Sequence, residues 1–108
     1  MIARTWRGTT RAADAERYAA YIEETGLQEY RATPGNQGAW LIYRVDGDVA
    51  HFLAISLWES MEAVRAFAGE QVERAVFYPQ DDEMLVERDL HADHWSVREA
   101  PDSAVGHG

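Results

Sequence analysis

The run Val49–Trp58 constrains the fold most, because its pattern is that of a strand with two apolar faces. Alternate side chains of a strand point to opposite faces of its sheet. One face of this run carries the aliphatic side chains of Leu53, Ile55 and Leu57, and the other carries small and aromatic side chains. Such a strand is usually central in its sheet and covered on both sides.

The rest of the chain supplies partners for this strand. Asp46-Gly47 is a favoured hairpin turn pair, so we expect the run before it to pair antiparallel with Val49–Trp58. Apolar residues at helical spacing predict two helical regions, and alternating patterns predict a first and a last strand. The predicted elements are a strand over Met1–Thr10, a helix over Arg11–Thr25, strands over Gly38–Val45 and Val49–Trp58, a helical region over Ser60–Phe77 and an edge strand over Leu85–Val97.

The order strand, helix, strand, strand, helix, strand is typical of an α+β, ferredoxin-like fold. It predicts one antiparallel four-stranded sheet with two helices on one face. Gly69 lies inside the second helical region, and the sequence leaves open whether it ends that helix or kinks it.

The sheet face without helices needs a cover, since a large exposed apolar patch marks an interface. We expect this free face to be the mixed face of the central strand together with one ring of the first strand. Pairing with a second copy through this face, as a homodimer, is the simplest cover. The residues of the predicted free face are Phe52, Ala54, Ser56, Trp58 and Trp6.

Length and charge narrow the possible partners. The chain of 108 residues predicts one domain over residues 1–99 and a disordered tail over residues 100–108. A net charge of −9, from 10 basic and 19 acidic residues, disfavours binding to nucleic acid.

The chain has no cysteine, which is typical of a reducing, cytoplasmic location. Neither a signal peptide nor an apolar run of membrane-spanning length is visible, so no membrane partner is expected.

Four stretches carry a family resemblance, in their order and spacing rather than in any single motif. They are Met1–Gly8, Ser56–Ser60, Ala63–Glu70 and His94–Val97. Together they resemble the antibiotic biosynthesis monooxygenase-like domain of the dimeric α+β barrel superfamily, in which many relatives carry a His-Tyr-Glu-Val run at the last stretch. The resemblance covers about 95 residues, a normal length for one domain.

The resemblance implies a barrel built from two sheets, one from each protomer, with a pocket in each protomer between sheet and helices. It also implies oxygenases that use no metal or flavin and oxidise aromatic phenols to quinones. Other members of the superfamily degrade haem with a Trp and an axial His on the second helix. Those positions correspond to Phe67 and Phe77 here, so haem chemistry is not expected.

His94 and Arg4 are the predicted catalytic residues. Metal-free oxygenation of a phenol needs a base for the phenolic proton and a donor for the oxyanion. Imidazole titrates near neutral pH, which makes His94 the candidate base, although it would equally suit a structural bond to a carbonyl. Arg4 lies on a predicted central strand and would hold the oxyanion, or else form an ion pair with Asp89 or Asp93.

Aromatic side chains are candidates for the wall of a pocket, with small residues leaving space between them. The alternative is that they are core or dimer contacts. The predicted substrate-binding residues are Trp6, Trp40, Phe52, Ser56, Trp58 and Phe67.

The residues and the resemblance together predict a small-molecule monooxygenase that works without a cofactor on an aromatic or polyketide-like substrate. Two alternatives remain open: a non-catalytic domain that binds a small ligand, and a structural dimeric module whose own rings fill the pocket. No metal site is predicted, because the histidines show neither His-x-His nor His-Glu-x-x-His spacing.

Overall fold

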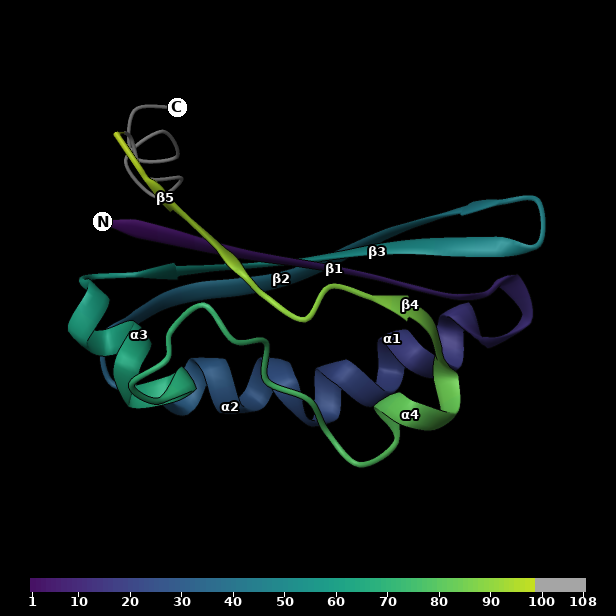
Figure 1. Cartoon of the computed structure of the whole chain (residues 1–108), viewed down its shortest axis with the longest axis horizontal. Coiled ribbons are helices and arrows are strands. Elements are labelled where there is room, and N and C mark those ends of the chain that lie inside the picture. Colours follow the sequence, from purple (N-terminus) through teal and green to yellow (C-terminus); the bar gives the residue numbers. More distant parts are fainter. Residues whose placement is uncertain (99–108) are drawn as a thin grey trace.

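The computed structural model describes residues 1–98, and it confirms the predicted α+β, ferredoxin-like fold (Figure 1). The predicted tail over residues 100–108 lies outside the described residues. The strands are β1 (Ile2–Arg11), β2 (Asn36–Asp46), β3 (Val49–Trp58), β4 (Leu85–Arg88) and β5 (Asp93–Ser96). The helices are η1 (Ala12–Asp14), α1 (Ala15–Glu24), α2 (Gly26–Ala32), α3 (Met61–Ala68) and α4 (Asp81–Met84).

The sheet is antiparallel throughout, with the order β2-β3-β1-β4 and with β5 also paired to β1. β3 is therefore central, as its two apolar faces predict. A hairpin joins β2 and β3 as predicted, but its two-residue loop is Gly47-Asp48 and not Asp46-Gly47, because Asp46 ends β2 and pairs with Val49. Gly47 adopts a φ of 63°, as the tight turn requires. The predicted last strand is two short strands, because residues 90–92 between them leave the edge of β1, whereas Asp89 still donates its N–H to the Arg7 carbonyl.

The helices differ from the prediction in where they end. The first helix begins at Ala15 rather than Arg11, and a second helix, α2, follows it after a break at Thr25. α3 begins as predicted, since the Ser60 hydroxyl accepts a hydrogen bond from the Ala63 N–H at 3.2 Å. It ends before Gly69, whose φ of 88° interrupts the helix.

The 69–80 segment that follows is largely irregular, so the predicted helical region through Phe77 is wrong beyond Ala68. Its backbone bonds to the connection between β4 and β5 instead. The Ala75 N–H donates to the Leu90 carbonyl at 3.0 Å, and the Glu73 carbonyl accepts from the Ala92 N–H at 2.7 Å. Backbone groups engaged in these long-range bonds are not available for a helix.

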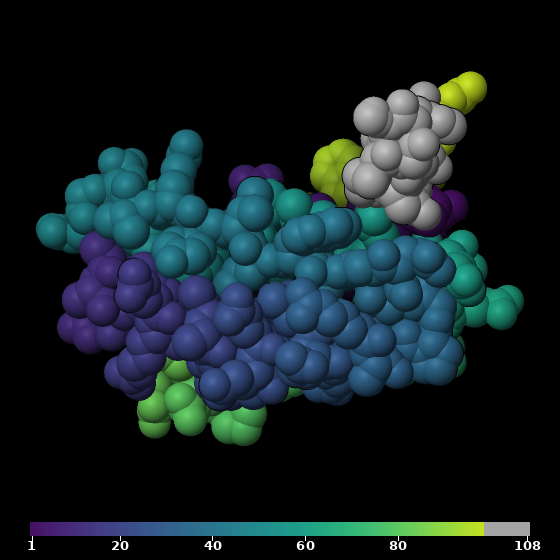
Figure 2. Space-filling view, turned by 180° about the vertical axis from the view of Figure 1, so that it is seen from behind, coloured from purple at the N-terminus to yellow at the C-terminus, as the bar shows by residue number. Residues whose placement is uncertain are grey.

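All the helices lie on one side of the sheet (Figure 1), and α1 and α2 run along β2 (Figure 2). The main core forms between them and this inner face of the sheet. The Tyr18 ring of α1, 1% exposed, meets Phe52 of β3 edge-on with centroids 5.0 Å apart. Burial of each such ring contributes about 1.5–3 kcal/mol, so this contact fixes α1 on the sheet.

The inner face carries Phe52, Ala54, Ser56 and Trp58, none more than 6% exposed. The prediction that these residues form the free dimer face is therefore wrong. Their strand is apolar on both sides, so alternation alone does not say which side the helices cover. Trp6 lies on the same inner face, opposite Ala54.

The opposite side of the sheet has no helix over it within residues 1–98 (Figure 1). We call it the outer face, and it is defined by Trp40, Ile42, Leu53, Ile55 and Trp95. Trp40, Ile42 and Trp95 are 42%, 52% and 57% exposed. The sheet thus has an uncovered apolar face as predicted, but with different residues. None of the helices in the described residues is long and apolar enough to span a membrane.

Candidate functional site

A cavity lies between the inner face, helices α1 and α2, and the 69–80 segment. It contains about 430 Å³ of atom-free space, part of it open to solvent, but only about 20 Å³ is wide enough for the centre of a water molecule. That is room for one water-sized group. The residues of the cavity that matter for its chemistry are Arg4, Trp6, Tyr18, Tyr30, Tyr78 and Asp81.

Arg4 is a buried charge at one end of this cavity, only 3% exposed. Its position on β1 turns it toward the inner face, opposite Ser56. Its guanidinium donates to the Val72 carbonyl at 2.5 Å and to the Arg74 carbonyl at 2.8 Å, so it fastens the 69–80 segment to the sheet. Burial lowers the pKa of Arg4, and the nearby Tyr30 works against that shift.

His94 of β5 is paired with Arg4 across the sheet, at 3.0 Å between His94 Nε2 and Arg4 Nη1. A guanidinium only donates, so Nε2 is the acceptor and the ring proton is assigned to Nδ1. Burial and then the Arg4 charge lower the pKa of His94, which keeps the ring neutral. The sequence thus correctly pointed to two residues that meet.

Two expectations about these residues change. Arg4 forms no ion pair within residues 1–98, so the alternative pairing with Asp89 or Asp93 is wrong. Its partners are two backbone carbonyls and a neutral imidazole. His94 is not part of the cavity lining, and its Nε2 lone pair already accepts from Arg4. Its role as a base stays a prediction.

The predicted aromatic wall is divided among three places. Trp6 lines the cavity. Trp58 and Phe67 lie beside it with ring centroids 5.6 Å apart, and the Phe67 ring centroid is 5.8 Å from the Arg4 Cζ. Trp40 is on the outer face, away from the other rings. The structure thus brings Trp6, Trp58 and Phe67 to the Arg4 side of the molecule but not Trp40.

Ser56 and Phe52 are less available than predicted. The Ser56 hydroxyl accepts the Trp58 Nε1–H at 2.9 Å and is 1% exposed, so it already has a protein partner. Phe52 is stacked on Tyr43 with ring centroids 4.8 Å apart, within the main core. Both residues support the walls around the cavity.

The other end of the cavity is polar, which sequence reasoning missed. Asp81, 2% exposed, accepts the Tyr78 backbone N–H on Oδ2 at 2.6 Å. Among residues 1–98, neither Asp81 Oδ1 nor the Tyr78 hydroxyl has a hydrogen-bond partner, although both atoms are buried. Burial raises the pKa of Asp81 and of Tyr78. Buried polar atoms are nearly always paired, so two unpaired ones in one cavity call for an explanation.

Local features of the chain create this polar end. The break between α1 and α2 places Gly26 against the Tyr78 ring, where an added Cβ would lie 3.3 Å from Cε2. Helix α4 is tied to α1 because the Tyr21 hydroxyl accepts the Gln80 N–H at 3.1 Å. Asp81 stands in an acidic run that resembles a solvated connection, so nothing in the local sequence marked it as buried.

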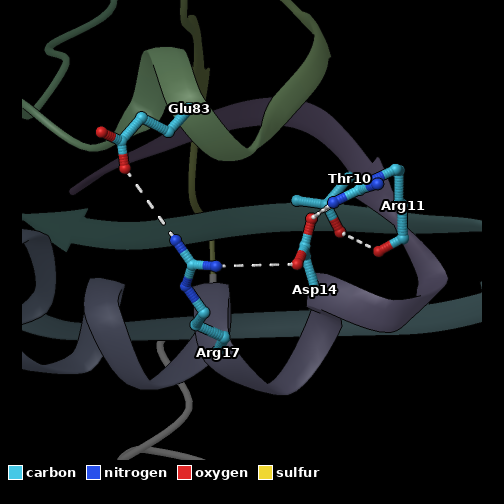
Figure 3. A network of polar contacts seen from close by, with 5 residues as sticks. All are labelled: Thr10, Arg11, Asp14, Arg17 and Glu83. Atoms are coloured by element: carbon cyan, nitrogen blue, oxygen red, sulfur yellow. Dashed lines mark hydrogen bonds and ion pairs between the residues drawn. The ribbon is translucent and has the colours of Figure 1, made fainter.

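A second tie between α1 and α4 runs over the surface (Figure 3). Arg17 of α1 lies 3.9 Å from the carboxylates of both Asp14 and Glu83, and Asp14 also accepts from Arg11. Arg11, Arg17 and Glu83 are exposed, so each pair contributes little on its own. Only the Arg17–Glu83 pair reaches α4, so the Tyr21–Gln80 hydrogen bond remains the main tie between α4 and α1. The described residues contain no group of three or more His, Asp or Glu side chains placed to hold a metal ion.

Several proteins of known structure share the fold of this chain. A proposed antibiotic biosynthesis monooxygenase from Deinococcus radiodurans superposes with a TM-score of 0.67 at 13% identity, over 93% of this chain and 95% of that one. SnoaB, a cofactor-independent oxygenase from Streptomyces nogalater, gives 0.60 at 19% identity, over 93% and 95%. The chain has the antibiotic biosynthesis monooxygenase-like fold. No family model and no curated protein matches its sequence.

The same fold also occurs in a protein whose structure contains a bound porphyrin. A MhuD variant with two manganese protoporphyrin IX molecules bound per active site superposes with a TM-score of 0.58 at 18% identity, over 93% of this chain and 97% of that one. At such identities the antibiotic biosynthesis monooxygenase-like fold is shared, but the activity follows only from the residues of the site.

Proposed function

We propose that the chain is a small-molecule monooxygenase that works without a cofactor on a hydroxyaromatic, polyketide-like substrate bound in the cavity of Arg4. The observation that carries the proposal is the buried Arg4 guanidinium, which lines a partly aromatic cavity. A fixed cation in a dry site stabilises an oxyanion far better than water-exposed charge does. Its similarity in fold to a cofactor-independent oxygenase supports the same conclusion.

The chemistry asked of the protein is modest. A phenol loses its proton to a base, and Arg4 holds the substrate oxygen on which the negative charge gathers. The phenolate then passes one electron to O₂, and the two radicals combine at a ring carbon to give a hydroperoxide. Loss of water leaves a quinone, so one phenol and one O₂ give one quinone and one water. The rings of Trp6 and Phe67 would exclude bulk water from these steps.

A porphyrin fits this site poorly. Haem chemistry needs an axial ligand, and the position expected to supply it is Phe77, which packs edge-on against Trp6 at 6.1 Å between centroids. Neither α3 nor the 69–80 segment contains a histidine. We therefore assign no haem-dependent step to this chain.

The second candidate is a domain that binds a small ligand without turning it over. The narrow cavity favours it, because only about 20 Å³ is wide enough for the centre of a water molecule. An aromatic substrate would enter only if the 69–80 segment moves away from the sheet. The two candidates differ in oxygen consumption, which only the oxygenase shows.

Oxygen uptake with a panel of phenols, naphthols and hydroxyanthrones tests the proposal, with quinone formation followed by absorbance. The Arg4→Lys variant keeps a positive charge but loses the planar guanidinium, whose N–H groups can bind several partners at once. We expect about a 100-fold lower kcat/KM. Arg7→Lys, on the same strand but exposed, is the matched control and keeps wild-type turnover. Absence of oxygen uptake across the whole panel would exclude the oxygenase and leave the binding domain.

His94→Gln tests the predicted base separately, with the exposed His91→Ala variant as its control. Gln can still accept from Arg4 but takes up no proton near neutral pH. If His94 is the base, the variant loses turnover and the loss does not depend on pH. Wild-type turnover in His94→Gln would remove His94 from the catalytic residues.

We also propose that a second copy of the chain covers the outer face. The exposed rings of Trp40 and Trp95 on this face would otherwise remain in water. Light scattering at micromolar concentration should give twice the protomer mass of 12.2 kDa. Ile55→Asp, in the middle of the outer face, should give a monomer, whereas Leu90→Asp, exposed but off this face, should not. A wild-type monomer would contradict the proposal.

A further inference from the structure

Asp81 is the group in the cavity whose chemistry the proposed function does not yet use. It lies at the start of α4, far from Arg4 in sequence, yet both residues line the same cavity. Its Oδ2 caps the Tyr78 backbone N–H, and Oδ1 remains buried with no partner among residues 1–98. A carboxylate oxygen accepts up to two hydrogen bonds, so Oδ1 is available to a ligand.

The surroundings of Asp81 suit a proton acceptor. The groups that act on its carboxyl are Tyr18 of α1, the Tyr78 N–H, Asp82 of α4 and Arg88 of β4. Burial outweighs the hydrogen bonds and the Arg88 charge, and it raises the pKa of Asp81. A carboxylate with a raised pKa takes up a proton more readily than an ordinary aspartate does.

His94 is less well placed for the same role. Its Nε2 accepts from Arg4, and the ring is outside the cavity lining. To act as base it would first have to give up the bond that orients Arg4. Asp81 Oδ1 has no hydrogen-bond partner within the described part of the chain, and the Tyr18 hydroxyl beside the carboxyl is the group that a ligand would compete with.

The cavity is therefore polar at two ends with opposite chemistry. Arg4 offers N–H donors to an oxygen that carries negative charge, and Asp81 offers an acceptor to an O–H group. A ligand in which a hydroxyl group is conjugated with a carbonyl group through an aromatic ring matches both ends, once the 69–80 segment has moved to admit it. Loss of the hydroxyl proton at Asp81 would move negative charge through the ring onto the carbonyl oxygen at Arg4.

We infer that Asp81 is the proton acceptor of this cavity and that its ligands are hydroxyaryl ketones held between Asp81 and Arg4. In the step, the ligand O–H bond breaks and an O–H bond forms on Asp81 Oδ1, while the electron pair stays on the ligand. No oxidant or reductant takes part. The inference rests on the proposed function for its choice of an aromatic ligand, but it concerns ionisation and not oxygenation.

The test uses 4-hydroxyacetophenone and 6-hydroxy-2-acetylnaphthalene, whose phenolate forms absorb at longer wavelength than their phenol forms. The probes are added to the full chain at a pH at which they are un-ionised in solution. We expect wild-type protein to bind them as phenolates. Analogues with ethyl in place of acetyl should bind about tenfold more weakly, because the charge at Arg4 then has no acceptor.

Asp81→Asn is the decisive variant, because its amide oxygen can still accept the Tyr78 N–H but its side chain cannot take a proton. It should bind the ketones as neutral phenols, with about tenfold weaker affinity. Asp82→Asn, exposed on the same helix, is the matched control and should keep the phenolate spectrum. His94→Gln should lower affinity through Arg4 but leave the bound ligand ionised.

Three results would overturn the inference: ketones bound to wild-type protein as phenols, a phenolate spectrum retained in Asp81→Asn, or one lost in His94→Gln alone. Each of them leaves the oxygen-uptake test of the proposed function open to succeed. Oxygen uptake could likewise fail while the phenolate spectrum appears, in which case Asp81 ionises a ligand that is not oxidised. A folded Asp81→Asn protein, checked by circular dichroism, is required for the comparison.

Discussion

Two buried ionisable groups of the cavity, Arg4 and Asp81, differ in how many of their polar atoms have protein partners. The Arg4 guanidinium donates hydrogen bonds to two backbone carbonyls and to an imidazole. Asp81 uses one oxygen on a backbone N–H, and within residues 1–98 its other oxygen has no partner. A paired buried charge holds a structure together, whereas an unpaired polar atom costs stability. Three of the five N–H donors of Arg4 are thus engaged without a ligand, whereas Asp81 Oδ1 has no partner among residues 1–98.

The largest effect should come from Arg4→Met, which removes the charge but keeps much of the side-chain volume. It leaves the Val72 and Arg74 carbonyls without their donor, and we expect a loss of about 3 kcal/mol in the free energy of unfolding. Urea unfolding measures this loss. Arg7→Met, on the exposed side of β1, should change stability by less than about 0.5 kcal/mol. Equal losses in both variants would show that Arg4 does not hold the 69–80 segment.

Tyr78→Phe should change the free energy of unfolding in the opposite direction from Arg4→Met, and by less. It removes a buried hydroxyl that has no partner in the described structure, so the free energy of unfolding should stay level or rise by about 1 kcal/mol. Tyr21→Phe is the matched comparison, because the Tyr21 hydroxyl accepts from the Gln80 N–H and its loss should cost about 1 kcal/mol. A clear loss of stability in Tyr78→Phe would mean that the hydroxyl has a protein partner, with Glu29 the nearest candidate.

The smallest expected effect is the change with pH in the contribution of Asp81 to the free energy of unfolding. Its pKa is raised in the folded chain, so its neutral form is favoured there and its contribution to stability is fully present below pH 3.8, the ordinary value. That contribution is lost as pH rises through the folded pKa. Asp81→Asn stays neutral, so its stability relative to wild type should improve between pH 3.5 and neutral pH. Urea unfolding across this range should show that the free energy of unfolding of Asp81→Asn, relative to wild type, rises with pH. A difference that does not change with pH would mean that the Asp81 carboxyl is exposed to water.

The sequence was informative wherever neighbours along the chain decide the structure. The hairpin between β2 and β3, displaced by one residue from the predicted pair, the start of α3 at Ser60 and the central place of β3 each follow from local chemistry. The 69–80 segment was mistaken for helix because Val72 and Ala75 have helical spacing. Its conformation depends on Arg4 and on the connection after β4, which are distant in sequence.

The candidate site was predictable in part for the same reason. An arginine on a central apolar strand is conspicuous, but its contact with His94 was not predicted, because strand order does not fix the register of β5 on β1. Asp81 stands in a run of acidic residues, and only the folded chain shows that it alone among its acidic neighbours is buried. The sequence also could not show which face of β3 the helices cover, because both faces of this strand are apolar.

Arg4 lines the cavity and also binds the carbonyls of Val72 and Arg74. The side chain that would meet an arriving anion therefore also fastens the segment that the anion has to pass. Opening of the 69–80 segment would then be a separate first-order step that limits capture. Association should be slower than diffusional encounter, and its observed rate should level off at high ligand concentration.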